Sequence, residues 1–381
     1  MEGEFRVIDI ERTSFKVNKF IKDIREYKLV PQEIWTMNKQ HRLTSLKLDW
    51  NESTIGPSPK VADRMKELLN EGIYNIYPNT NNKTLVESIA AYSNLPCEYI
   101  QYFASSDSLH EYICRLYLNQ YSRVLILSPS YDNFRLTAES FGAEIIYSDL
   151  STDFRFNREL FEQDIKNYKP SLVYICNPNN PTGTQHNIEY IEYLLINFDK
   201  TLFLIDEAYW EFSGITAKNL VKKYRNILIS RTFSKAFGLA NFRIGYMLAS
   251  PFHIEMINKI RNPKNITTFS QEAAIAALSD LEYMKEYVNI VNDSKEYFYQ
   301  ELSNCYVFGK AIKGEGNFLL FLCKNENIKQ KIIDYLKNNN IFVRSIAQRP
   351  STLNCIRFSI GTREQMSKVL NVLTKMKKEF L

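Results

Sequence analysis

The 381-residue chain lacks the features that mark membrane and secreted proteins. No apolar run approaches the roughly 20 residues that a membrane-spanning helix requires. The first residues mix charged and apolar side chains and contain no apolar block of the kind found in signal peptides. With 45% hydrophobic and 24% charged residues, the composition is typical of a water-soluble globular protein. We therefore expect a cytoplasmic protein with no membrane partner.

The sequence also lacks the residue spacing of a metal site or a disulfide framework. Its six cysteines are scattered without a C-x-x-C pair, and its four histidines lie far apart. This pattern argues against zinc and favours reduced thiols. Neither sign of charge dominates, because 48 basic and 43 acidic residues leave a net charge of only +5. The basic run at 375–378 is interpreted as a solvated helix end, so neither a metal nor a nucleic acid is expected.

The middle of the chain alternates short apolar segments with helical ones. Segments of this length that are rich in Val, Ile and Leu predict parallel strands in a sheet covered by helices. Polar residues follow three of the strands: Asn180, Asp206 and Lys235. Ligands bind beyond the carboxyl ends of the strands in such sheets. The apolar segments are VLILSPS (124–130), SLVYIC (171–176), TLFLID (201–206) and NILISRT (226–232).

A second unit is predicted after the alternating region. The pattern is helical from about Ser270 to Ser303 and contains no proline. Strands are predicted within 314–324, 338–346 and 354–362, with one helix between the first two and another closing the chain. We therefore predict a large α/β domain over 46–270 and a small α+β domain over 271–381. The N-terminal arm, residues 1–45, is predicted to pack with the small domain.

Lys235 stands among apolar residues in the segment RTFSKAFGL. By itself it is explained equally well as a surface lysine with a buried stem. A lysine in apolar surroundings, however, has a lowered pKa and can attack a carbonyl to form a Schiff base. The polar groups expected near it match the parts of pyridoxal 5'-phosphate. The carboxylate of Asp206 suits a protonated ring nitrogen, and Asn180 and Tyr209 suit a phenolic oxygen.

The phosphate and the ring face of that cofactor also have matching side chains. A helix is predicted to begin after the turn at Ser105, Ser106 and Asp107, and a helix N-terminus offers free N–H groups to an anion. Thr232, Ser234 and Arg243 add hydroxyl and guanidinium donors, and the Tyr131 ring suits stacking.

Taken together, the motifs resemble a known family. The chain is similar to fold-type I pyridoxal-phosphate enzymes of the class I/II aminotransferase group, and most closely to histidinol-phosphate aminotransferases. The resemblance runs in order from residue 48 to 362, and it implies an aspartate aminotransferase-like fold. The matching segments are LDWNESTIGPSP (48–59), YNIYPN (74–79), SSDS (105–108), SPSY (128–131), NPNNPTG (177–183), DEAYWEF (206–212), TFSKAFGLANFRIGY (232–246) and IRFSIGT (356–362).

The resemblance implies a role for each matching residue. Lys235, Asp206 and Tyr209 become the catalytic set, with Lys235 bonded to the cofactor and moving the substrate proton. A tyrosine at the position of Tyr77 reaches the cofactor of a neighbouring subunit, which implies a homodimer with shared sites. The implied cofactor-binding residues are Ser105, Ser106, Asp107, Tyr131, Asn180, Asp206, Tyr209, Thr232, Ser234, Lys235, Arg243 and Tyr77.

The implied substrate-binding residues are Asn51, Arg344 and Arg357, and the two arginines match positions that hold the anionic end of the substrate. The chain departs from the family around these positions. Gln32 follows Pro31 where the family has a tyrosine, residues 51–54 read NEST in place of NENP, and 102–104 lack the usual glycines. These departures concern histidinol phosphate as the substrate and leave the cofactor residues intact.

Three functions are compatible with these observations. The first is an aminotransferase that moves an amino group, with glutamate as the expected donor, to a small phosphorylated carbonyl compound. The second is a decarboxylase of a phosphorylated amino acid on the same fold, of the threonine-phosphate or serine-phosphate type. The third is a ligand-sensing regulator, which needs a DNA-binding module for which the 45 residues before the pattern leave little room. We rank the three in that order.

Overall fold

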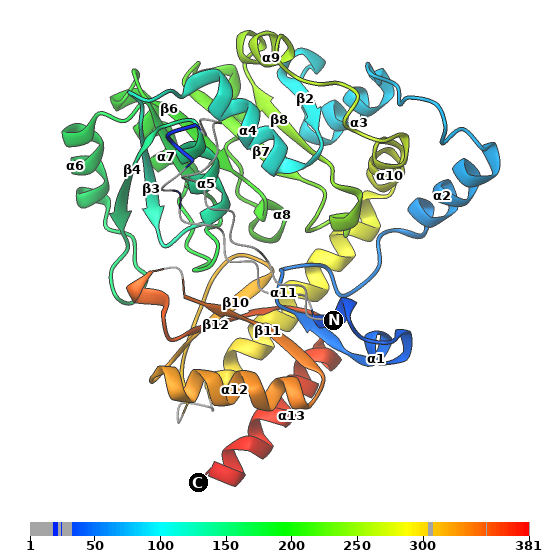
Figure 1. The fold of residues 1–381 in the computed structure, drawn as a ribbon, viewed down its shortest axis with the longest axis vertical. Helices are drawn as coiled ribbons and strands as arrows, with labels where there is room; N and C mark the ends of the chain where they lie inside the picture. The colour runs from blue at the N-terminus through cyan, green and yellow to red at the C-terminus, as the bar shows by residue number, and fades with distance from the viewer. Residues whose placement is uncertain (1–17, 22–23, 25–32, 304–307, 348, 381) are drawn as a thin grey trace, which may run out of the picture.

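The structure is a computed structural model that describes residues 18–21, 24, 33–303, 308–347 and 349–380. Two β-sheets organise this part of the chain, and helices pack against both of them (Figure 1). The seven-stranded sheet comes from residues 100–249, and the five-stranded sheet joins residues 46–48 to residues 309–359. None of the helices in the described ranges has the length and apolarity needed to cross a membrane.

The larger sheet has the strand order β2-β8-β7-β6-β5-β3-β4. β4, β3, β5, β6 and β7 pair with one another in parallel, which confirms the predicted, mostly parallel sheet. Two strands that the sequence pattern did not indicate, β8 and β2, extend the sheet by antiparallel pairing. The bounds are β2 (Ile100–Phe103), β3 (Arg123–Ser128), β4 (Glu144–Asp149), β5 (Leu172–Cys176), β6 (Leu202–Asp206), β7 (Ile227–Thr232) and β8 (Gly245–Ala249).

Both faces of the central strands are covered, because the helices that connect parallel strands pack on the sheet. Every residue of β5 and β7 is buried, so neither strand shows the polar alternation of a half-exposed strand. Helices form the connections between consecutive strands, which brings the carboxyl ends of β3, β5, β6 and β7 to one edge of the sheet. The helices of this unit are α4 (Ser105–Tyr117), α5 (Asp132–Ser140), α6 (Arg158–Tyr168), α7 (Ile188–Asn197), α8 (Trp210–Ser213) and α9 (Pro251–Asn258).

The smaller sheet has the order β1-β11-β12-β10-β9. The three strands predicted after residue 310 are present, and β1 and β9 complete the sheet. β1 pairs in parallel with β11, so a segment near residue 46 lies in the same sheet as the C-terminal strands. The domain boundaries at 45 and 270 stay predictions. The strand bounds are β1 (Leu46–Leu48), β9 (Gly309–Ile312), β10 (Phe318–Cys323), β11 (Ile341–Ile346) and β12 (Cys355–Ser359).

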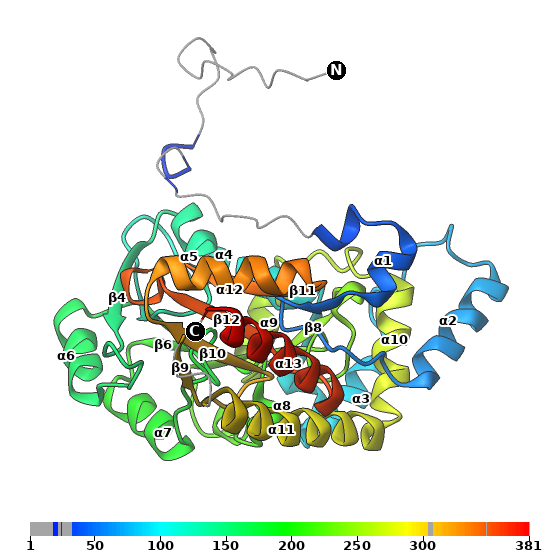
Figure 2. The same cartoon turned by 90° about the horizontal axis from the view of Figure 1, so that it is seen from below.

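The helical stretch predicted from Ser270 to Ser303 is divided in two. It consists of α10 (Thr268–Leu278) and α11 (Leu281–Ser303). Asp280, a residue type that favours helix starts, precedes α11 and accepts a hydrogen bond from Ser58. α11 packs beside the C-terminal helix α13 (Arg363–Phe380), which in turn packs beside α12 (Glu326–Asn338) (Figure 2). The other helices are α1 (Lys39–Thr44), α2 (Pro59–Glu71) and α3 (Lys83–Ser93).

The loop after β5 touches the small sheet unit at a pair of glycines. Gly183 has φ +74°, and a Cβ there would lie 2.5 Å from the Cα of Gly314. The Glu315 N–H donates to the Gly183 carbonyl at 3.0 Å. No other residue type allows this approach of the two backbones. The contact places the loop that carries Asn180 against the C-terminal sheet, at the edge where the central strands end.

Candidate active site

A pocket of about 890 Å³ lies where the carboxyl ends of β5, β6 and β7 face β1, β11 and β12. Of the fifteen residues that the sequence nominated, thirteen line this single pocket. Chain segments from residue 51 to residue 357 therefore converge at one place. The thirteen are Asn51, Ser106, Asp107, Tyr131, Asn180, Asp206, Tyr209, Thr232, Ser234, Lys235, Arg243, Arg344 and Arg357.

Lys235 lies in a tight turn three residues beyond β7. The turn is held by the Ser234 N–H, which donates to Thr232 Oγ1 at 3.0 Å, and by the Gly238 N–H, which donates to the Lys235 carbonyl at 3.1 Å. The Lys235 Nζ donates to the Trp50 carbonyl at 3.1 Å. Burial lowers the pKa of the Lys235 amine to about 8, and the positive charge of Arg357 contributes in the same direction. A substantial fraction of the amine is therefore neutral near pH 8.

Asp206 is the last residue of β6, and its side chain is buried. Its Oδ2 accepts a hydrogen bond from the Tyr174 hydroxyl at 2.7 Å, and its Oδ1 accepts one from the Ala208 N–H at 3.1 Å. In the described part of the chain no lysine or arginine pairs with it, and His110 Nε2 stands 4.0 Å away.

The neighbouring residue Glu207 differs from Asp206 in having a charged partner. Glu207 is equally buried but forms an ion pair with Arg231 at 2.8 Å. A buried carboxylate needs a charged partner, so Asp206 is suited to a cation brought by a ligand.

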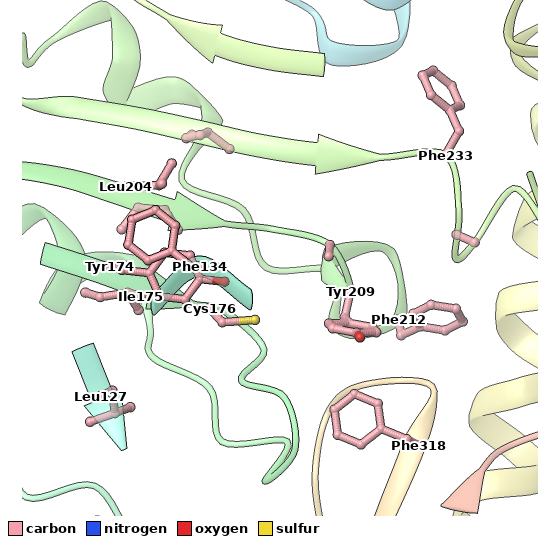
Figure 3. Close-up of a cluster of buried hydrophobic side chains, with 14 of the residues drawn as sticks. Leu127, Phe134, Tyr174, Ile175, Cys176, Leu204, Tyr209, Phe212, Phe233 and Phe318 are labelled. Carbon is pink, nitrogen blue, oxygen red and sulfur yellow. The ribbon is translucent and has the colours of Figure 1, made fainter. Parts of the chain in front are cut away.

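Tyr209 sits at the centre of a hydrogen-bonded group. Its hydroxyl accepts from Asn51 Nδ2 at 3.1 Å and from Asn180 Nδ2 at 3.2 Å. Burial raises the pKa of the Tyr209 phenol well above its usual range, so the proton stays on the oxygen. The ring meets Phe318 of β10 edge-on, with 5.1 Å between centroids (Figure 3). The side chains of Asn51, Asn180 and Tyr209 thus form one hydrogen-bonded polar surface of the pocket.

The start of α4 forms an anion-binding corner of the pocket. Ser105 has φ +88°, a conformation that favours glycine, yet the position holds a serine. The absence of a side chain at Gly245 is required here, because a Cβ would lie 2.9 Å from the Ser106 nitrogen. The first N–H groups of a helix have no backbone partner within it, and Ser106 and Asp107 of this first turn line the pocket together with Thr232 and Ser234.

Asp107 organises this corner through its side chain. Its carboxylate accepts from the Tyr131 hydroxyl at 2.9 Å and from Asn133 Nδ2 at 3.2 Å, and it pairs with Arg243 at 3.3 Å. Its carboxylate therefore orients an aromatic ring and a guanidinium group, while its backbone N–H belongs to the first turn of α4.

Arg344 and Arg357 are directly opposite each other on the antiparallel strands β11 and β12. Opposite residues of such a pair share one face of the sheet, so both side chains reach the pocket wall. Arg357 donates to Asn180 Oδ1 and to the Asp49 carbonyl, both at 2.7 Å. The Arg344 guanidinium lies 5.6 Å from the Trp50 ring centre, and its buried Nη1 has no hydrogen-bond partner in the described part of the chain.

Two nominated residues lie outside this pocket. Ser105 is buried, and Tyr77 is 77% exposed on the surface, with Lys264 Nζ 5.2 Å from its ring centre. Gln32, at which the chain departs from the family, lies outside the described residues.

Sequence reasoning missed several residues near the site. Tyr174 and His110 contact or approach Asp206, and Trp50 and Trp35 line the pocket. The one available signal was the position of Trp50, directly before Asn51. Nothing in the spacing of Tyr174 or His110 connects them to Asp206.

Comparison with known proteins places the chain among transaminases. Residues 44–373 match the family model described as aminotransferase class I and II. A dihydroxyacetone phosphate transaminase of Campylobacter jejuni is 41% identical over 365 residues, which is 96% of this chain and 98% of that protein. A histidinol-phosphate aminotransferase of Ruminiclostridium cellulolyticum is 32% identical, covering 88% of this chain and 94% of its own.

A solved structure has the same fold. The crystal structure of histidinol-phosphate aminotransferase from Sinorhizobium meliloti in complex with pyridoxal-5'-phosphate aligns with a TM-score of 0.86 at 25% identity. The alignment covers 97% of this chain and all of that one. The predicted large and small units of a fold-type I enzyme are confirmed by this agreement.

Proposed function

The chain belongs to the aminotransferase class I and II family, and on that premise we propose that it moves an amino group between glutamate and a small phosphorylated carbonyl compound. The acceptor to test first is dihydroxyacetone phosphate. The proposal is carried by one observation: Arg344 faces Arg357 on the wall of the pocket that contains Lys235 and Asp206.

Pyridoxal phosphate is the cofactor of this transaminase. When bound, it carries the amino group between substrates and withdraws electrons from the reacting carbon. The residues present fit it. Asp206, with which no lysine or arginine of the described residues pairs, would hold the ring nitrogen, whereas Tyr209 and Asn180 would hold the phenolic oxygen. The α4 N-terminus with Thr232, Ser234 and Arg243 would hold the phosphate.

Lys235 is the residue that would hold the cofactor covalently and move the substrate proton. Its Nζ has a pKa of about 8, so the neutral amine can both accept a proton and return it near neutral pH. The tight turn that follows β7 limits the movement of the side chain. Tyr209, whose ring centre lies 5.8 Å from the Lys235 Nζ, borders the path of that proton.

The two arginines support an anionic substrate. Two guanidinium groups on one wall can engage the three terminal oxygens of a phosphate, or the carboxylate of glutamate in the other half of the reaction. Asn180 and the Asp49 carbonyl hold Arg357 in place, while the Nη1 of Arg344 has no hydrogen-bond partner among the described residues. Asn51 borders the same space through its contact with Tyr209.

The Campylobacter jejuni relative supports a three-carbon ketone as the acceptor. That protein is named for dihydroxyacetone phosphate and aligns with nearly the whole chain. The departures of this sequence from histidinol-phosphate aminotransferases at residues 51–54 and in the N-terminal arm favour a substrate other than histidinol phosphate.

A homodimer with shared active sites also belongs to this proposal. Tyr77 is exposed and lies outside the pocket of its own chain, which leaves it available to the pocket of a second copy. Its neighbours Ile73, Tyr74 and Ile76 are exposed as well.

The test is a panel of carbonyl compounds with glutamate as donor. It includes dihydroxyacetone phosphate, dihydroxyacetone, the oxo form of histidinol phosphate, and phosphoserine as a potential substrate for decarboxylation. We expect dihydroxyacetone phosphate to have the highest kcat/KM and its unphosphorylated form to be poor.

Arg344→Gln should lower kcat/KM for the phosphorylated ketone by tenfold or more, because a hydrogen bond to a charged group contributes roughly 1.5–3 kcal/mol. Arg363→Gln, which alters an arginine of α13 that stacks on Tyr297, is the matched control. Equal rates with and without the phosphate would contradict the substrate class, and carbon dioxide released from phosphoserine would favour the decarboxylase.

A further inference from the structure

We propose that Tyr174 is a positioning residue that keeps the Asp206 carboxylate ionised and aimed at the pyridine nitrogen of the cofactor. The inference rests on the role of Asp206 in the proposed function. Tyr174 lies on β5, next to β6, and does not line the pocket. It therefore acts through Asp206 and does not touch the reacting groups.

The contact between the two side chains is short and fully buried. The Tyr174 hydroxyl donates to Asp206 Oδ2 at 2.7 Å, and the Ala208 N–H donates to Oδ1 at 3.1 Å. Each carboxylate oxygen thus has one fixed donor from the protein and retains a lone pair for a ligand. A hydrogen bond to an ionised acceptor is stronger than one between neutral groups, so the Tyr174 bond favours the charged carboxylate.

Packing holds the Tyr174 ring in the position from which its hydroxyl donates to Asp206. Phe134 of α5 stacks on the ring at 4.2 Å with an interplanar angle of 10° (Figure 3). His110 of α4 meets the ring edge-on at 5.8 Å, and its Nε2 is 3.0 Å from Ser230 Oγ on β7. α4 and α5 both begin beside the anion-binding corner of the pocket. The helices that border the pocket therefore also hold the Tyr174 ring in place.

The phenol remains a donor throughout the physiological range. Burial raises the pKa of Tyr174 well above its usual value, and the negative charge of Asp206 adds to the effect. With this donor in place, the proton shared between the carboxylate and the ring nitrogen stays on the nitrogen. Without it, the carboxylate loses a donor that favours its charged form, so its interaction with a protonated ring nitrogen would weaken.

The experiment compares Tyr174→Phe with the wild-type holoenzyme. The substitution removes one oxygen and keeps the ring that packs on Phe134. Tyr190→Phe is the control, because the Tyr190 hydroxyl is buried without a hydrogen-bond partner in the described ranges and does not line the pocket. Each protein is loaded with pyridoxal phosphate labelled with nitrogen-15 in its ring, and the ring-nitrogen chemical shift is measured.

In Tyr174→Phe the chemical shift should move toward that of the neutral pyridine, and the rate constant of the half-reaction with glutamate should fall about tenfold. Tyr190→Phe should match the wild type in both measurements. The proposal is overturned if folded, cofactor-loaded Tyr174→Phe keeps the wild-type chemical shift and rate.

The variant Asp206→Asn distinguishes a failure of the role proposed for Tyr174 from a failure of the role proposed for Asp206. If Asp206→Asn also leaves the nitrogen signal unchanged, the role proposed for Asp206 is wrong. If Asp206→Asn changes the signal and Tyr174→Phe does not, only the role of Tyr174 fails.

Discussion

Lys235 holds its proton less tightly than a solvated lysine does, because burial and the charge of Arg357 both disfavour the ammonium form. The effect matters chemically, since only the neutral amine attacks a carbonyl or accepts a proton. The same property can be measured without any substrate, in protein from which the cofactor has been removed.

We predict that Lys235 in the cofactor-free protein reacts with acetic anhydride with a pH midpoint of about 8, whereas an ordinary lysine has a pKa of 10.5. The rate should rise as pH increases through the midpoint, because the neutral fraction rises, and site-resolved mass spectrometry measures it. Arg357→Gln should move the midpoint upward by removing a neighbouring positive charge. A midpoint near that of the ordinary lysines would show that the amine is not perturbed.

At the scale of elements, α8 brings a second carboxyl group into the buried region behind the site. Glu211 is near Arg231, which already pairs with Glu207, and its Oε1 is 3.4 Å from the Tyr92 hydroxyl of α3. One guanidinium cannot fully compensate the buried Glu207 carboxylate and the partly buried Glu211 carboxylate together. Burial raises the pKa of Glu211 from 4.5 to about 8, so the folded protein holds it protonated at neutral pH.

The raised pKa of Glu211 predicts that the free energy of unfolding depends on pH. Between pH 4.5 and 8 the folded state binds one proton more than the unfolded state at Glu211, so this residue lowers the free energy of unfolding as pH rises through that window. Glu211→Gln should remove the effect and stabilise the protein at pH 8 by an amount on the order of a few kcal/mol. At pH 5 the difference from wild type should be small.

Thermal unfolding followed by circular dichroism at the two pH values measures this difference. Glu87→Gln, which changes an exposed glutamate of α3, is the control. A stabilisation by Glu211→Gln that is the same at pH 5 and pH 8 would show that Glu211 does not titrate in this window.

At the scale of the whole molecule, an exposed apolar group stands out around the end of α2. It comprises Leu69, Ile73, Tyr74, Ile76 and Tyr77, which are between 36% and 77% exposed. Contiguous exposed apolar side chains of this kind mark interaction surfaces. The group includes Tyr77, which the resemblance assigns to the active site of a neighbouring subunit. We therefore favour a second copy of this chain as the partner.

We predict that the protein is a dimer and that Ile76→Glu weakens it, because a charge would be buried in the contact. Light scattering coupled to size-exclusion chromatography gives the mass, and equilibrium dialysis gives the affinity for pyridoxal phosphate, which should fall with dimer loss. Tyr121→Glu, at an 85% exposed site elsewhere, should leave both unchanged. A fully active wild-type monomer would contradict the shared site.

The sequence by itself predicted the parallel strands, the small second sheet and the cofactor, because these depend on local patterns. Short runs of Val, Ile and Leu indicate buried strands, and Asp206 lies at the end of one such strand and Lys235 three residues beyond another. The stretch predicted as helical from about Ser270 to Ser303 is helical apart from one break at residues 279–280, which the pattern did not indicate.

Only the tertiary structure decided which distant residues meet. Arg344 and Arg357 face each other because the antiparallel register of β11 and β12 pairs them, and a shift of one residue would send one of them to the other face. Tyr174 reaches Asp206 because β5 pairs with β6, and His110 joins them from α4, although no periodicity connects the three. Sheet register and helix packing are set by contacts between segments far apart in the chain, so they cannot be read from any one segment alone.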